Sequence, residues 1–203
     1  MATFNYIDLQ IPEARLVADL SGIEWDLRRT RDYAHLLISE LGSSSPNWQL
    51  VEPLSIASAV AYSRAFISGV RHNLRESDLV VLSPAQRSAH DYIRTFRDKH
   101  VAHSVNVFEE NFARAYYREE RVYEEGFISI GSGGGRVAGL SSAEAQTIVE
   151  LTTVLEAHVE QRIASEKETL LATVRTMPIN EVLSSGQSVF NPPITDVVKR
   201  RKP

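Results

Sequence analysis

The sequence predicts a mainly α-helical protein, built as an up-and-down four-helix bundle with a small β-hairpin insert before the last long helix. In four segments the apolar residues recur at intervals of three, four and seven positions, which places them on one face of a helix. Between residues 106 and 140 this spacing gives way to aromatic, β-branched and glycine residues, which are typical of strands and turns. With 203 residues, 43% of them apolar and 24% charged, the chain has the composition of one ordinary globular domain.

The first predicted helix extends from Pro12 to Leu41. Pro12 suits the first turn of a helix, where a backbone N–H has no partner in any case, and Gly42 with the serines after it ends the helix. Its expected apolar stripe consists of Leu16, Leu20, Ile23, Leu27, Ala34, Ile38 and Leu41.

The second and third helices are predicted from near Pro53 to about Leu74 and from Ser83 onward. Small residues along the second helix favour close packing against a neighbour. The third begins with Ser83 as a capping hydroxyl, Pro84 at the first position, and Gln86, which is placed to reach back to the cap.

The insert within residues 106–140 is predicted as a small β-hairpin or a three-stranded unit. Phe112–Tyr117 and Tyr123–Ile130 have the aromatic and β-branched composition of strands. Residues 131–135, Gly-Ser-Gly-Gly-Gly, have the composition of a flexible turn. A phosphate-binding loop is not predicted there, because the loop contains no lysine and no helix starts directly after its last glycine.

The last helix is predicted from Ser141 to about Met177, with Glu144 completing a second capping box. A helix of that length measures roughly 50 Å, which favours packing along a partner chain. Residues 1–177 are therefore expected to form the domain. Residues 178–203, which include Lys199–Lys202, are expected to form a mobile basic tail.

Composition excludes several classes of protein. The chain has no cysteine, so disulfide scaffolds, thiolate zinc sites and cysteine nucleophiles are ruled out. Its net charge of −4 means that nucleic acid would need a local basic patch. No signal peptide or membrane span is apparent, so a cytoplasmic protein with no membrane partner is expected. We expect no cofactor and no metal.

The residues most suggestive of chemistry lie at the end of the third helix. Arg97 and His103 are six positions apart, about 120° around a regular helix, but a long arginine side chain spans part of that gap. Arginine offers a planar, permanently charged fork to a phosphate, and histidine exchanges a proton near neutral pH. The pair suits cleavage of RNA without a metal: His103 acts as general acid or base, and Arg97 stabilises the phosphoryl transition state.

Arg97-Asp98 followed by His103 resembles the signature of the HEPN superfamily, and the order of helices and insert looks like the abortive-infection U group within it. The resemblance implies a homodimer in which two copies of the motif face one another across a cleft. It further implies a metal-independent endoribonuclease that acts on single-stranded RNA, as a toxin with an antitoxin protein or in antiphage defence. Arg97 and His103 would be the catalytic pair, and Asp98 would orient one of them.

Other interpretations of these residues remain open. A cluster such as Arg97 to His100 also complements the dipole at a helix C-terminus, and the protein is then a catalytically inactive helical dimer that binds a protein or a nucleotide. The aromatic residues of the insert either stack on exposed RNA bases or, as we favour, pack the hairpin onto the helices. The candidate phosphate-binding residues are Arg64, Arg71, Arg94, Lys99 and His100.

Overall fold

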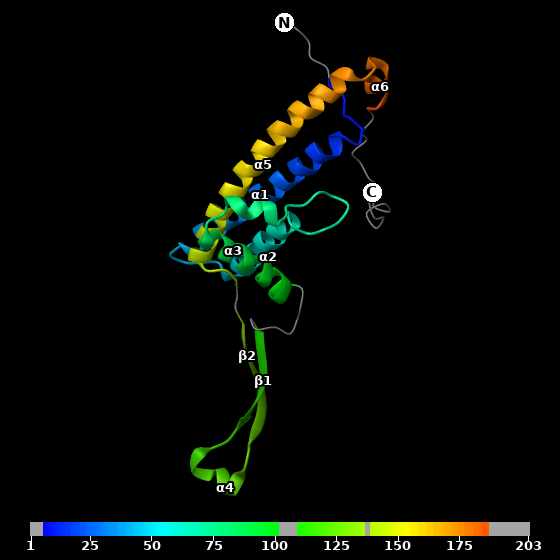
Figure 1. The fold of residues 1–203 in the computed structure, drawn as a ribbon. Helices are drawn as coiled ribbons and strands as arrows, with labels where there is room; N and C mark the ends of the chain where they lie inside the picture. Colours follow the sequence, from blue (N-terminus) through cyan, green and yellow to red (C-terminus); the bar gives the residue numbers. More distant parts are fainter. Residues whose placement is uncertain (1–5, 102–108, 137–138, 187–203) are drawn as a thin grey trace.

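The computed structural model describes residues 6–101, 109–136 and 139–186, and it consists of a helical body from which a β-hairpin projects (Figure 1). The elements are α1 (Ala14–Leu41), α2 (Trp48–Arg64), η1 (Glu76–Val81), α3 (Pro84–Phe96), η2 (Arg97–Val101), β1 (Glu109–Tyr116), η3 (Glu119–Arg121), α4 (Val122–Glu125), β2 (Ser129–Arg136), α5 (Ser142–Thr176) and α6 (Ile179–Ser184). The mainly α-helical class and the two-stranded insert are as predicted.

The helical body is built on α1 and α5, which run antiparallel along each other, with α2 packed against α1 and α3 against both α2 and α5 (Figure 1). The predicted stripe of α1 supplies part of the core, since Leu20, Ile23, Leu27 and Ala34 are buried, together with Leu37. The largest buried side chains contributed by the other helices are Tyr62, Ile93, Phe96, Leu151, Leu155 and Val159.

Both predicted capping boxes are present. The Ser83 hydroxyl accepts a hydrogen bond from the Gln86 amide, and the Gln86 side chain accepts one from the Ser83 amide. Ser141 and Glu144 make the same exchange at the start of α5. These contacts depend only on residues three apart, so the sequence alone was sufficient to predict them.

The second helix differs from its prediction at both ends. It begins at Trp48, because the Asn47 side chain accepts a hydrogen bond from the Gln49 amide, and Pro53 lies inside it. It ends at Arg64 and does not continue to Leu74. There the chain turns back, with the Leu74 amide donating to the Ala65 carbonyl at 2.8 Å, so the residues in between lie outside the helix.

The hairpin also corrects the prediction, because its glycine run lies in a strand. β1 and β2 pair antiparallel from Glu109 opposite Arg136 to Tyr116 opposite Ser129. The reversal of the chain falls at residues 117–128, which contain η3 and α4. The glycines in β2 leave room for the rings of β1: a Cβ added at Gly133 would lie 2.8 Å from the Phe112 ring.

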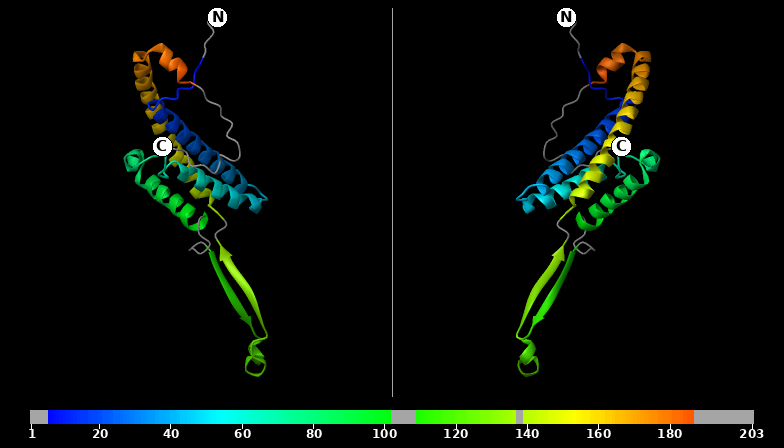
Figure 2. Two further views of the ribbon diagram at one scale, coloured as in Figure 1. Left: turned by 90° about the vertical axis from the view of Figure 1, so that its right-hand side faces the viewer. Right: turned by 90° about the vertical axis from the view of Figure 1, so that its left-hand side faces the viewer.

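The hairpin extends away from the helical body in every view (Figures 1 and 2). The two strands contact each other extensively, but neither makes an extensive contact with a described helix. The expectation that the aromatic residues pack the insert onto the helices is therefore wrong for the described residues: Phe112, Tyr116, Tyr117, Tyr123 and Phe127 are all exposed.

The C-terminal region differs from the predicted mobile tail as well, since Ile179–Ser184 forms the short helix α6. Residues 187–203, including Lys199–Lys202, lie outside the described residues. Among the described helices, none combines the length and the apolar character needed to span a bilayer.

Candidate functional site

The motif region begins where α3 ends. Phe96 is the last α-helical residue, and Arg97–Val101 continues as a π-helical turn, η2, which contacts α2. A π turn widens the helix by one residue and re-aims the side chains that follow, and such turns are frequent at functional sites. The structure therefore places Arg97 and Asp98 at an irregular helix end.

Arg97 and Asp98 form a local pair at this end. An Arg97 Nη1 hydrogen donates to Asp98 Oδ1 at 2.7 Å, and the Arg97 side chain is 35% exposed. Within the described residues, Arg97 makes no side-chain hydrogen bond to a helix carbonyl. An arginine that only capped the helix would donate to those carbonyls, whereas here the guanidinium is oriented by its neighbour.

His100 is held against the helix by aromatic stacking. Its ring lies 4.7 Å from the Phe96 ring at an interplanar angle of 27°, and Phe96 in turn lies 6.5 Å from Tyr92. His100 is half-buried, so its position is consistent with supporting the turn from the inside. His103, the second predicted catalytic residue, lies outside the described residues.

The predicted phosphate-binding residues fall into two groups. Arg94 and Lys99 are exposed near the turn, and neither has an ion pair within the described ranges. Arg64 and Arg71 instead converge on the buried carboxylate of Asp26 in α1, at 3.3 and 2.8 Å. Arg71 also donates to the Arg64 carbonyl at 2.7 Å, so this pair closes the end of α2 onto α1.

A groove of about 660 Å³ lies between α2, α3 and the residues at the start of α5. Tyr92 of α3 lines it together with Trp48, Val51 and Leu140, and Glu144 lies at its edge. Burial raises the pKa of the Tyr92 phenol to about 12, and its hydrogen bond to Glu144 acts in the same direction. Tyr92 therefore stays protonated at neutral pH and serves as a hydrogen-bond donor to Glu144.

The residues that lead into α5 are anchored to α2 through Ser55. The Leu140 amide donates to the Ser55 hydroxyl oxygen at 2.9 Å. Gly139 permits this approach, because a Cβ there would lie 2.4 Å from the same oxygen. Residues 139–141, which lead into α5, are thus held against α2.

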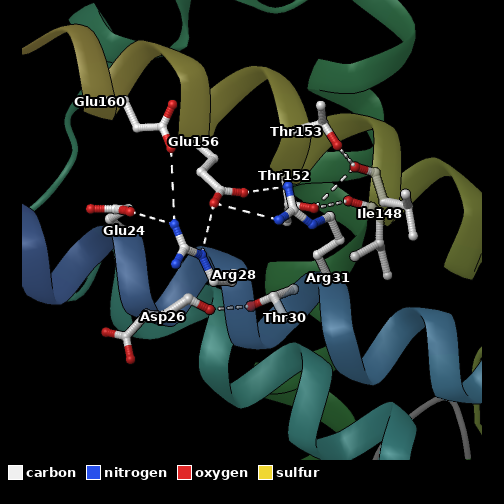
Figure 3. A network of polar contacts seen from close by, with 11 residues as sticks. Glu24, Asp26, Arg28, Thr30, Arg31, Ile148, Thr152, Thr153, Glu156 and Glu160 are labelled. Carbon is white, nitrogen blue, oxygen red and sulfur yellow. Dashed lines mark hydrogen bonds and ion pairs between the residues drawn. The ribbon is translucent and has the colours of Figure 1, made fainter.

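A polar network of arginines and glutamates joins α1 to α5 (Figure 3). Arg28 Nε donates to Glu156 Oε1 at 3.1 Å, and Arg31 contacts the other oxygen of the same carboxylate. Glu24 and Glu160 bring further carboxylate oxygens within 4.8 Å, so the geometry alone would admit a cation. However, Arg28 lies among the three carboxylates, 2.6 Å from Glu24, and its charge compensates theirs. The cluster is an ion-pair network between helices.

A second buried carboxylate, Asp78, attaches η1 to α5. It accepts hydrogen bonds from His158 at 3.2 Å and Arg162 at 2.6 Å. Burial opposes ionisation of Asp78, but these contacts and the Arg75 amide outweigh it and lower the pKa of the carboxyl group. His72, 3.4 Å from Arg162, has a pKa lowered by burial and by that cation.

Within the described residues, the core contains a polar pair of Tyr62 and His90. The Tyr62 hydroxyl and His90 Nδ1 lie 2.7 Å apart, and both side chains are buried. Burial lowers the pKa of His90, so this ring is neutral at pH 7.

The sequence did not predict this pair or the buried acids Asp26, Asp78 and Glu156, because a charged residue within an amphipathic helix has no sequence signal for burial.

No family model matches the chain, and neither the curated proteins nor the solved structures include a match.

Proposed function

We propose that this protein is a metal-independent endoribonuclease of the HEPN type that cleaves single-stranded RNA with Arg97 and His103. The observation that carries the proposal is the state of Arg97: its guanidinium is partly exposed at a π-helical turn and is oriented by Asp98. The Arg97-Asp98 and His103 spacing, which resembles the HEPN signature, supports the same assignment.

The proposed reaction is an internal transfer at phosphorus. The 2′-hydroxyl of the RNA attacks the adjacent phosphate, and the P–O5′ bond breaks. The products are a 2′,3′-cyclic phosphate and a 5′-hydroxyl. His103 removes the proton from the 2′-hydroxyl or supplies one to the leaving oxygen. Arg97 donates hydrogen bonds to the non-bridging oxygens, whose charge grows in the transition state, while Asp98 holds its fork in place.

The proposal includes a homodimer in which two motifs face one another, and a role as a toxin or antiphage component with an antitoxin partner. Both elements rest on the resemblance to the HEPN superfamily. Exposed Arg94 and Lys99 near the turn add positive charge where an RNA backbone would approach. Arg64 and Arg71 are left out of the proposed site, because they pair with Asp26.

The test is cleavage of a single-stranded RNA in the presence of EDTA. We expect cleavage by the full chain, and its loss in Arg97→Ala and His103→Ala variants that keep the wild-type circular dichroism spectrum. Arg87→Ala is the matched control, since Arg87 lies on the same helix but contacts Glu76 away from the turn. Replacement of the 2′-hydroxyl by hydrogen in the RNA should also abolish the reaction.

Cleavage that needs added metal, or equal cleavage by the wild type and both alanine variants, would refute the mechanism. No cleavage under any condition would leave the catalytically inactive binding module as the function.

A further inference from the structure

One side of α1 carries a short pattern of apolar and charged residues that no described element covers. Trp25, Arg29, Asp32 and Leu36 lie within an arc of about 60° around the helix. Trp25 and Leu36 are 61% and 56% exposed, and Arg29 and Asp32 are exposed as well. We call these four residues the outer face of α1.

The outer face points away from both neighbours of α1. Arg28 and Arg31 reach Glu156 of α5 (Figure 3). Asp26 meets Arg64 at the end of α2. The outer face lies on the remaining side of the helix, so its tryptophan and leucine stay in water in a single chain. Apolar side chains gathered on one open face are typical of a contact surface.

The spacing of the outer face complements itself about a two-fold axis. Trp25 and Leu36 have the same midpoint in the sequence as Arg29 and Asp32, between residues 30 and 31. When two copies of a helix pack antiparallel about an axis at that midpoint, residues at equal distances on either side of it lie opposite each other. Trp25 of each copy then meets Leu36 of the other, and Arg29 meets Asp32.

Both charges of the outer face are available for such a contact. Within the described residues, the ion pairs of α1 are made by other residues of the helix. An antiparallel pair places Arg29 against a carboxylate at two symmetric points, whereas a parallel pair would place each charge beside its own copy, which is unfavourable. The charges of this face therefore match its own two-fold image in the antiparallel orientation alone.

The neighbouring side of α2 enlarges this surface. A stable interface covers about 800 Å² on each partner, whereas one tryptophan contributes roughly 150–250 Å². Leu50 and Val60 are exposed on α2 and lie within about 40° of Arg64 around that helix. Because Arg64 contacts Asp26, this side of α2 borders α1. The open surface thus extends over two helices.

We propose that the outer face of α1, flanked by Leu50 and Val60, binds a second copy of this chain, with the two α1 helices antiparallel about a two-fold axis near residues 30 and 31. The inference goes beyond the proposed function, because it assigns a surface and a register from residues that take no part in the cleavage of RNA.

The test is sedimentation equilibrium of the full chain at low micromolar concentration and low salt. We expect the wild type to be a dimer. Trp25→Ala should weaken the dimer at least about tenfold, since tryptophan is a frequent hot spot of protein interfaces. Trp48→Ala is the matched control, because Trp48 is also exposed but lines the groove beside Tyr92. It should dimerise like the wild type.

Reversal of the charges tests the register. Arg29→Asp and Asp32→Arg, made singly, bring like charges together at two symmetric points, and each should weaken the dimer about tenfold. The variant that carries both substitutions restores opposite charges at both points and should recover most of the affinity. Both positions are exposed, so all three variants should keep the wild-type circular dichroism spectrum.

A dimer that Trp25→Ala leaves within about twofold of the wild type would overturn this inference alone. So would a dimer that Trp48→Ala weakens as much, or a doubly substituted variant that binds no more tightly than the single ones. A monomeric wild type would overturn both this inference and the homodimer of the proposed function. Loss of RNA cleavage in a chain that still dimerises through Trp25 would refute only the proposed function.

Discussion

Replacing Glu156 tests whether the helical body depends on the network between α1 and α5. The Glu156 side chain is 6% exposed and contacts both Arg28 and Arg31. Glu160, one turn further along the same helix, is 55% exposed and lies 3.9 Å from Arg28. The two residues thus share a helix, a chemistry and a partner, and they differ in burial.

Glu156→Gln removes the negative charge but keeps an oxygen that accepts hydrogen bonds. Breaking a buried ion pair by removing one partner costs about 3–5 kcal/mol. Here both arginines reach water, and the amide retains part of the hydrogen bonding, so we expect a loss of about 2 kcal/mol in the free energy of unfolding. Glu160→Gln should cost under about 0.5 kcal/mol, as is usual for an exposed pair.

The measurement is urea denaturation followed by far-ultraviolet circular dichroism. Both variants should unfold with the slope of the wild type, and only Glu156→Gln should have a clearly lower midpoint. Equal midpoints for the two variants would show that burial of this carboxylate does not control its contribution. A changed slope would mean that the substitution altered the folded or unfolded ensemble and not one contact.

Two further predictions follow from the histidine in the core and from the helix caps. Burial lowers the pKa of His90, so the unfolded chain binds more protons than the folded one below the ordinary histidine pKa. The free energy of unfolding should therefore fall as pH drops from about 6.5 to 5, and this fall should be smaller in His90→Gln when midpoints are measured across that range. Ser141→Ala should lower the free energy of unfolding by about 1 kcal/mol because it removes the cap of α5, whereas Ser142→Ala, one position inside the helix, should leave the urea midpoint nearly unchanged.

Much of the fold followed from the sequence alone because the signals were local. Both ends of α1 and of α5 lie within two residues of their predicted positions, and so does the start of α3. The sequence carries a cap or an apolar stripe at each of these ends, whereas it carries neither at the end of α3. The insert was also recognised, since strands have a composition of their own. The motif at Arg97 was proposed from the chemistry of arginine and histidine, and its function stays a prediction.

Only the tertiary structure decided which side chains are buried, paired or exposed. The positive charges of Arg64 and Arg71 suggested phosphate binding, but both side chains pair with Asp26. The run from Gly131 to Gly135 suggested a turn, but it lies in a strand beneath aromatic rings of β1. Helix caps and periodicity depend on residues a few positions apart, so they are present in the sequence itself. Burial, ion pairs and ring placement join residues distant in the chain, and they exist only once α1, α2 and α5, or the two strands, have packed together.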